Sequence, residues 1–204
     1  MRSVTIKPPN MEVVSKYHAT NEDMLHEQVL VENARKDPEQ FKALYNKYYE
    51  RIFLFVWQRC DDKEVAFDVT SQVFLKAMMN IYKYEFKGVP FASWLYRIAK
   101  SEVYTAFRQQ QAKRTVNIDT AGLGEMIDDM EEDKYGPYIE ILKESITELE
   151  EDDMQFIEMR FFEKRAFREI ADIFGITENN AKVKTYRILE KLKKILVEKK
   201  KNKK

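Results

Sequence analysis

The sequence is poor in the residues that disulfides, metal sites and tight turns require. Its 204 residues include one cysteine (Cys60), two histidines, five glycines and five prolines. A single cysteine excludes an intramolecular disulfide and a cysteine-rich metal site, and fits a reducing compartment. Few glycines and prolines argue against an all-β or disordered chain. Strong helix formers dominate the periodic segments, so we predict an all-α fold.

Long apolar runs are also absent. No run approaches the roughly 20 residues needed to span a membrane, and the first residues, MRSVTIKPPN, lack the apolar core of a signal peptide. We therefore expect no membrane insertion and a cytoplasmic location. His18 and His26 both lie near the N-terminus, and no helix carries a metal-ligand pair at i, i+4. We expect no metal, no cofactor, no small-molecule substrate and no enzymatic activity.

Charge is balanced over the chain but not along it. There are 35 basic and 35 acidic residues. Residues 41–114 carry 13 basic against 7 acidic residues, and residues 156–204 carry 15 against 7, whereas residues 115–155 carry 2 against 14. Two basic blocks separated by an acidic one indicate two modules that face nucleic acid and an acidic connector.

The patterns predict two small helical domains joined by an acidic linker. The expected segments are a flexible tail at 1–21, a first domain at 22–114, the linker at 115–137, a second domain at 138–197 and a basic tail at 198–204. In the first domain we expect helices at about Asn21–Lys36, from Asp37-Pro38 onward, and from a cap at Asp61 to about Tyr82. The second helix is expected to bury Phe41, Leu44, Tyr45, Tyr48, Ile52, Phe55 and Val56.

The third expected helix has an unusual outward face. Its core face is Ala66, Val69, Thr70, Val73, Ala77 and Ile81. The opposite face carries the polar Asp68, Ser71 and Gln72 beside the apolar Leu75 and Met79. Apolar residues among hydrogen-bonding groups favour a docking surface for another helix. The alternative is that another segment of this chain covers them.

Aromatic and basic residues alternate from Tyr82 to Arg114. Single-stranded nucleic acid needs both, because cations follow phosphates and rings stack on unpaired bases. Gly88 and Pro90 predict a loop at Lys87–Pro90 and a new helix from Phe91. On that helix one stripe holds Arg97, Lys100, Ser101, Tyr104 and Arg108, and the opposite stripe holds Leu95, Ile98, Ala99, Val103 and Ala106.

Two details of this helix leave its role open. Glu102 falls within the apolar stripe, where only a buried or edge ion pair would accommodate it. The whole stretch also fits an ordinary amphipathic surface helix, with its rings packed inward and its cations solvated.

A second pattern lies between Phe167 and Leu196. Gly175 is placed to end one helix in the left-handed conformation, and Thr177 is placed to cap the next. This spacing is typical of a helix-turn-helix, whose second helix enters the major groove. Its two faces are Asn180, Lys184, Arg187 and Lys191 on one side and Ala181, Thr185, Ile188, Leu192 and Leu196 on the other. The alternative is a three-helix unit with an incidental basic face.

Together the two modules resemble the extracytoplasmic-function (ECF) group of bacterial RNA polymerase sigma factors. FKALYNKYYERIF, DVTSQVFLKA and FKGVPFASWLYRIA are similar to region two of that family, and MRFFEKRAFREIADIFGITENNAKVKTYR resembles region four. The likeness covers about residues 24–114 and 138–196. The resemblance implies a protein that binds core RNA polymerase and directs promoter recognition and DNA melting at transcription initiation.

The resemblance also implies which residues do this. Polymerase binding falls on Asp68, Ser71, Gln72, Leu75, Lys76 and Met79. The minus-ten promoter element falls to Lys87, Phe91, Trp94, Arg97, Lys100, Ser101, Tyr104 and Arg108. The minus-thirty-five element falls to Thr177, Asn179, Asn180, Lys182, Lys184, Arg187 and Lys191. Implied partners are core RNA polymerase, promoter DNA and, as in many relatives, an anti-sigma factor.

Two other functions remain as alternatives. A helix-turn-helix transcription regulator that is no polymerase subunit would explain the second module. It would leave both the Tyr82–Arg114 stretch and the Leu75–Met79 face of the third helix without a function. A helical adaptor protein would need neither basic face.

Overall fold

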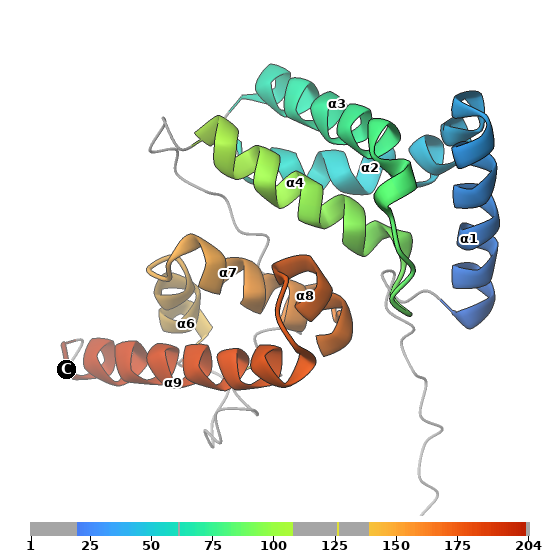
Figure 1. The fold of residues 1–204 in the computed structure, drawn as a ribbon. Helices are drawn as coiled ribbons and strands as arrows, with labels where there is room; N and C mark the ends of the chain where they lie inside the picture. The colour runs from blue at the N-terminus through green and yellow to red at the C-terminus, as the bar shows by residue number, and fades with distance from the viewer. Residues whose placement is uncertain (1–19, 61, 108–125, 127–138, 203–204) are drawn as a thin grey trace, which may run out of the picture.

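The protein is helical wherever its structure is described. The computed structural model describes residues 20–60, 62–107, 126 and 139–202, and that part of the chain contains no strand (Figure 1). The α-helices are α1 Asn21–Lys36, α2 Phe41–Trp57, α3 Lys63–Met79, α4 Phe91–Phe107, α6 Ile139–Ile146, α7 Glu151–Ile157, α8 Phe167–Phe174 and α9 Glu178–Asn202. Short 3-10 turns occupy Pro38–Gln40 and Ile81–Lys83, and a π-helical turn occupies Glu158–Phe162. The all-α prediction is confirmed.

Helices α1–α4 form the first domain. The α1 bounds match the prediction, and Thr20 caps this helix by accepting a hydrogen bond from the Asp23 backbone N–H. The predicted core residues of α2 are buried except Tyr45, which is 38% exposed. The prediction for Tyr45 is wrong because its ring lies at the edge of the α2–α3 contact, 4.8 Å from the ring centre of Phe74 and 5.1 Å from that of Tyr49.

The ends of α3 differ from the prediction, although its core face is buried as expected. The cap is Asp62, whose side chain accepts a hydrogen bond from the Glu64 backbone N–H at 2.8 Å. Asp61, the predicted cap, lies outside the described residues. The helix ends at Met79 because the chain turns at Asn80 into the Ile81–Lys83 3-10 turn rather than continuing to Tyr82.

Helices α6–α9 form the second domain, and α8 and α9 make the predicted helix-turn-helix. Gly175 ends α8 with φ 67°. The Thr177 hydroxyl accepts a hydrogen bond from the Asn180 backbone N–H at 3.2 Å, as expected of a cap. The apolar face predicted for α9 is buried throughout. With no helix breaker among its lysines and glutamate, α9 continues to Asn202, so residues 198–202 of the predicted tail are helical.

The two domains pack against each other. Helix α4 lies between α2 and α3 on one side and α8 on the other (Figure 1). One cluster of buried residues runs through both domains, and Met126 from the predicted acidic linker is fully buried in it. The rest of that linker and the tail at 1–19 lie outside the described residues.

Gly175 allows a test of the turn between α8 and α9. Its φ is positive, yet a Cβ placed there would meet no atom within 4 Å. Gly175→Ala should therefore act through backbone strain alone and lower the free energy of unfolding by about 1 kcal/mol. Urea denaturation followed by circular dichroism measures this difference. An unchanged unfolding midpoint would contradict the assigned turn.

Candidate nucleic-acid interface

The predicted basic face of α4 forms, and its apolar face is mostly buried. The loop before it contains Gly88 with φ 70°, and the helix begins at Phe91 as predicted. Ser101 and Tyr104 are exposed, and Arg97 and Lys100 are half-buried, while Arg108 lies outside the described residues. On the opposite stripe Leu95, Ala99 and Val103 are buried and Ile98 is half-buried. Ala106 is exposed, contrary to the prediction, because it lies close to the end of the helix.

Several aromatic rings of this stretch belong to the core rather than to the surface. Phe91, predicted to contact DNA, is 1% exposed. Its ring lies between those of Tyr48, Tyr84 and Trp94 at centroid distances of 5.0–6.0 Å. A buried ring has no free face for a base to stack on, so a direct contact between Phe91 and DNA stays a prediction that this arrangement does not support. Trp94 is half-buried, and its ring centre lies 5.5 Å from that of Phe91.

The anomalous Glu102 is explained by an ion pair at the edge of the core. Its carboxylate lies 2.6 Å from the Lys76 ammonium group, with 13% of the Glu102 side chain and 50% of the Lys76 side chain exposed. The sequence-based expectation of an ion pair here is confirmed. The contact also ties α4 to the outward face of α3, since Lys76 belongs to the residues predicted to bind polymerase.

Three cations in and just before α4 contact acidic and carbonyl groups of the second domain. The Arg97 guanidinium donates hydrogen bonds to the backbone carbonyl of Asp172, at 2.9 Å from Nε, and also to its carboxylate. Lys87 lies 3.9 Å from the same carboxylate. Lys100 lies 2.9 Å from the carboxylate of Asp152, at the start of α7. In this closed arrangement the second domain occupies part of the surface predicted to contact DNA.

Two arginines, Arg59 and Arg165, are buried in the contact between the two domains. Arg59 of the first domain pairs with Glu158 of the second at 2.6 Å, and the two side chains are 1% and 3% exposed. Arg165 is fully buried over the Tyr96 ring, 4.1 Å from its centre. Burial acts to lower the pKa of Arg165, but the carboxylates of Glu163 and Glu169 outweigh it and raise this pKa. The Arg165 guanidinium therefore stays charged inside the contact.

A groove of about 640 Å³ separates α4 from the start of α9. Its polar lining includes Lys87, Arg97, Arg168, Asp172, Thr177 and Asn180. Arg168 crosses it and donates a hydrogen bond to the Lys87 carbonyl at 2.5 Å. A volume of this size suits a small molecule and is far too small for a DNA duplex.

The basic face of α9 is partly paired as well. Thr177, Asn179, Asn180 and Arg187 are exposed. Lys184 and Lys191 lie 3.4 Å and 3.5 Å from the two carboxylate oxygens of Asp153. Lys182 pairs with Glu178 on its own helix at 2.8 Å. The predicted face exists, and Arg187 is an exposed cation on it.

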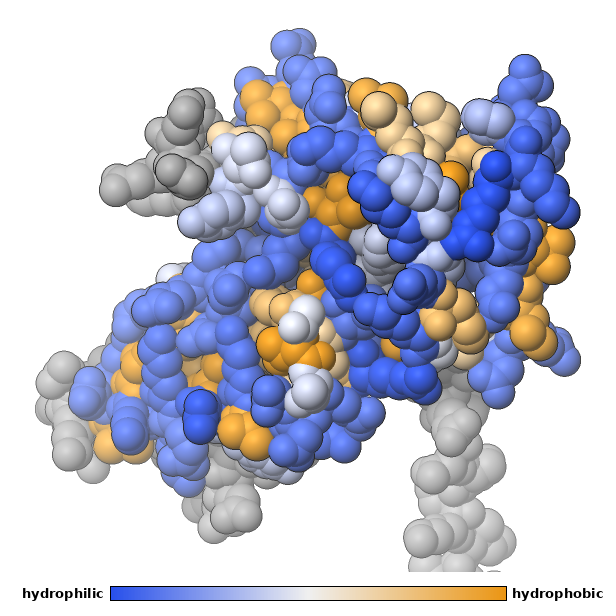
Figure 2. Space-filling model, viewed as in Figure 1, coloured by the Kyte–Doolittle hydropathy of each residue, from blue (hydrophilic) through white to orange (hydrophobic). Residues whose placement is uncertain are grey.

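The outward face of α3 is open to solvent. Asp68, Ser71 and Gln72 are exposed, and Leu75 and Met79 are 45% and 64% exposed. Figure 2 shows hydrophobic residues lying among hydrophilic ones at the top of the molecule, where α3 lies in Figure 1. No segment that the structure describes covers this face, so the alternative of an internal cover finds no support there.

Sequence reasoning missed the acidic partners in the second domain. Asp152, Asp153 and Asp172 contact cations that were assigned to DNA. A signal for two of them was present, because Glu150-Glu151-Asp152-Asp153 is an acidic run, which favours the start of a helix, and its last three residues lie in the first turn of α7. No comparable signal marks Asp172, whose role depends on how α8 packs against α4.

Neither a metal centre nor a membrane helix appears in the described parts of the chain. No group of three or more potential ligands among His, Cys, Asp and Glu is close enough to hold a metal ion there. Among the same residues, no helix is long and apolar enough to cross a membrane.

Comparison with known families accounts for both domains. The family model "Sigma-70 region 2" matches residues 44–113, and the model "Sigma-70, region 4" matches residues 139–192. Together the two models span more than half of the chain, in the order and spacing of the two domains. The chain belongs to the sigma-70 family. It is an RNA polymerase sigma factor, and its second domain carries the helix-turn-helix of region 4.

Curated relatives place this sigma factor in the ECF group. The ECF RNA polymerase sigma factor BldN of Streptomyces coelicolor is 26% identical over 186 residues, which cover 87% of this chain and 69% of BldN. The RNA polymerase sigma factor YlaC of Bacillus subtilis is 24% identical, over 78% of this chain and 93% of YlaC. The ECF sigma factor SigM of the same organism is 22% identical, over 74% of this chain and 91% of SigM.

Two solved structures share the sigma factor's fold. CnrH, in complex with the cytosolic domain of CnrY, has a TM-score of 0.56 and 14% identity, over 83% of this chain and 96% of CnrH. RpoE from Bartonella quintana, in complex with the anti-sigma factor NepR, has a TM-score of 0.51 and 18% identity, over 78% and 97% of the respective chains.

Proposed function

We propose that the first domain binds core RNA polymerase through the outward face of α3 and contacts the minus-ten element through the Lys87–Pro90 loop and α4. The α9 face of the second domain reads the minus-thirty-five element in the major groove. The protein acts in the cytoplasm, where polymerase and promoter DNA meet, and has no enzymatic activity of its own. An anti-sigma factor is a further partner, an inference supported by the RpoE–NepR complex.

One observation carries this proposal. The cationic faces of α4 and α9 belong to different domains, and acidic groups of the second domain contact both of them. A surface that binds protein carboxylates in one state has the charge and geometry to bind phosphates in another. The sigma factor is therefore proposed to open on polymerase and promoter, so that DNA replaces Asp152 and Asp172 at the cations of α4.

Reconstitution with core polymerase separates this proposal from its alternatives. We expect the purified chain to co-elute with core polymerase and to direct run-off transcription from a cognate promoter. A conventional regulator would bind duplex sites without polymerase. An adaptor would neither bind duplex sites nor direct run-off transcription. Failure to associate with core polymerase would reject the proposal.

The polymerase face of α3 can be tested by a double substitution. Asp68→Ala combined with Leu75→Ala should weaken binding to core polymerase at least tenfold, because each truncation at the centre of an interface commonly costs about 1 kcal/mol or more. Fluorescence titration of labelled protein with core polymerase measures this affinity.

A matched control places the same kinds of change on α1. Glu22 and Val29 are exposed there, so Glu22→Ala with Val29→Ala also removes one acid and one apolar side chain. Both double variants should keep the helicity of the parent protein. Equal affinities of the parent and the α3 variant for polymerase would show that this face is not the docking surface.

A further inference from the structure

Helix α1 holds the segment that connects α3 to α4, although it lies outside the residues matched by the region 2 model. That segment, from Ile81 to Phe91, includes the exposed ring of Phe86 and the exposed Lys87. Two side chains of α1, Glu27 and Arg35, reach it at opposite ends.

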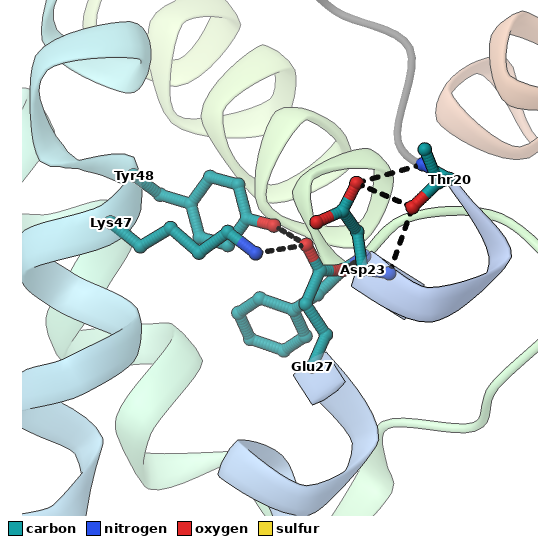
Figure 3. Close-up of polar contacts among 6 residues, drawn as sticks. Thr20, Asp23, Glu27, Lys47 and Tyr48 are labelled. Carbon is teal, nitrogen blue, oxygen red and sulfur yellow. Dashed lines mark hydrogen bonds and ion pairs between the residues drawn. The ribbon is translucent and has the colours of Figure 1, made fainter. Parts of the chain in front are cut away.

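Glu27 holds the end of the segment that leads into α4. Its side chain is almost fully buried, and one carboxylate oxygen accepts a hydrogen bond from the Phe91 backbone N–H at 2.8 Å. The other oxygen lies 2.7 Å from the Lys47 ammonium group and also accepts a hydrogen bond from the Tyr48 hydroxyl (Figure 3). A carboxylate at the N-terminus of a helix satisfies a free N–H group and interacts favourably with the helix dipole.

The Glu27 carboxylate also affects the pKa of Tyr84, a buried residue of the same segment. Burial and then the charge of Glu27 raise the pKa of Tyr84 to about 12. The neutral Tyr84 ring packs edge-on against Phe91 and lies 5.4 Å from Trp94. Glu27 thus holds the Phe91 backbone through its hydrogen bond, and the rings of Tyr84 and Phe91 pack against the ring of Trp94.

Arg35 holds the other end of the segment. Its guanidinium donates hydrogen bonds to the backbone carbonyls of Ile81, at 3.2 Å, and Tyr84. Glu32, one turn earlier on α1, orients this guanidinium through an ion pair at 2.6 Å. The rigid, planar fork of an arginine is well suited to place donors toward two carbonyls at once.

The two contacts together fix both ends of a short loop. Glu27 and Arg35 are eight residues apart, so α1 separates their backbones by about 12 Å. Between the two held points lies Glu85–Pro90, which carries the exposed Phe86 and Lys87. In the closed arrangement this stretch is also contacted from the second domain, where Arg168 donates a hydrogen bond to the Lys87 carbonyl. A group held in its working geometry before it meets its target loses less entropy on binding.

We propose that α1 is a rigid brace for promoter opening, with Glu27 and Arg35 as positioning residues that hold the Tyr84–Pro90 loop in the shape that captures an unpaired base. This inference rests on the proposed contact of the loop and α4 with the minus-ten element. Neither side chain touches DNA in this account. Their effect is on the step in which the duplex opens, rather than on the initial binding of duplex promoter.

The test compares two templates with the same holoenzyme, assembled from core polymerase and the full chain. One template is the duplex promoter, and the other carries a pre-melted minus-ten region. Arg35→Met should lower the rate of open-complex formation on the duplex about tenfold, the effect of losing a hydrogen bond from a charged group. On the pre-melted template it should transcribe within about twofold of the parent, since the opening step is bypassed. Glu27→Gln should likewise slow open-complex formation on the duplex and leave transcription from the pre-melted template largely unchanged.

Lys36→Met is the matched control, because Lys36 is an exposed cation on the same turn of α1. It should leave both templates unaffected. Equal losses of Arg35→Met on both templates would show a purely structural role, and no loss on either would show that the brace is dispensable, so either result overturns the inference. Failure of the parent protein itself to form a transcribing complex would instead reject the proposed function.

Discussion

Replacing Glu158 by alanine is expected to destabilise the closed arrangement of the two domains by about 3–5 kcal/mol, the usual cost of removing one partner of a buried ion pair. Glu158 supplies the carboxylate 2.6 Å from Arg59, and both side chains are almost fully buried where the second domain meets α2. Without it, the Arg59 charge stays in a medium that solvates it poorly. Opening of the domains, which returns this guanidinium to water, relieves the penalty.

The effect should appear as domain separation before it appears as loss of helix. Dyes on the two domains report separation by energy transfer during a urea titration, and far-ultraviolet circular dichroism reports helix content. In Glu158→Ala the loss of energy transfer should occur at much lower urea concentration than in the parent, with a smaller change in the helix transition.

Two controls define this result. Glu150→Ala removes an exposed acid eight residues earlier and should leave both transitions unchanged. Arg59→Met combined with Glu158→Leu replaces the whole pair by apolar groups and should recover most of the lost stability. Coincident energy-transfer curves for Glu158→Ala and the parent would show that the pair does not hold the domains together.

Replacing Arg187 by alanine is expected to weaken promoter binding by about 1–3 kcal/mol, which is about 5-fold to 150-fold in affinity, if this side chain contacts a base directly. Arg187 is exposed on the face of α9 that a helix-turn-helix presents to the major groove. The expected loss is larger than for Lys184→Ala, because Lys184 is partly buried and already pairs with Asp153 of its own domain.

Sequence specificity distinguishes a base contact from a phosphate contact. Holoenzyme affinity is measured on a promoter with its upstream element intact and on one with that element scrambled. Arg187→Ala should lose affinity on the intact promoter and little on the scrambled one. Lys199→Ala, a cation near the end of α9 that pairs with Glu148 at 2.6 Å, serves as the control and should not discriminate. A uniform loss on both promoters would assign Arg187 to the phosphate backbone.

The sequence was sufficient to predict features that depend on local patterns. The left-handed Gly175, the Thr177 cap and the buried stripe of α9 follow from residue type and helical spacing, and all are observed. The exposed Leu75 and Met79 were also predictable, because a helix has only one face to bury against its neighbours. The start of α3 was misplaced by one residue because Asp61 and Asp62 are equally good caps by sequence.

Features that depend on packing between distant segments were not predictable. Phe91 carries the pattern of a stacking residue, but its burial follows from how Tyr48 and Tyr84 close around it. Arg97 lies on a basic stripe, and nothing local indicates that Asp172, 75 residues later, contacts it. No sequence signal distinguishes Glu27 from the other acids of α1, and its role appears only when the N-terminus of α4 is placed beside it.

The distance between the two domains tests the account most directly. With Cys60 replaced by serine, dyes attached through Glu64→Cys on α3 and Glu198→Cys on α9 report this distance, since both positions are exposed. We predict high energy transfer in the isolated sigma factor and a large decrease when core polymerase and promoter DNA bind. Unchanged energy transfer in a transcriptionally active complex would contradict it, because α4 and α9 would then contact DNA without leaving the closed arrangement.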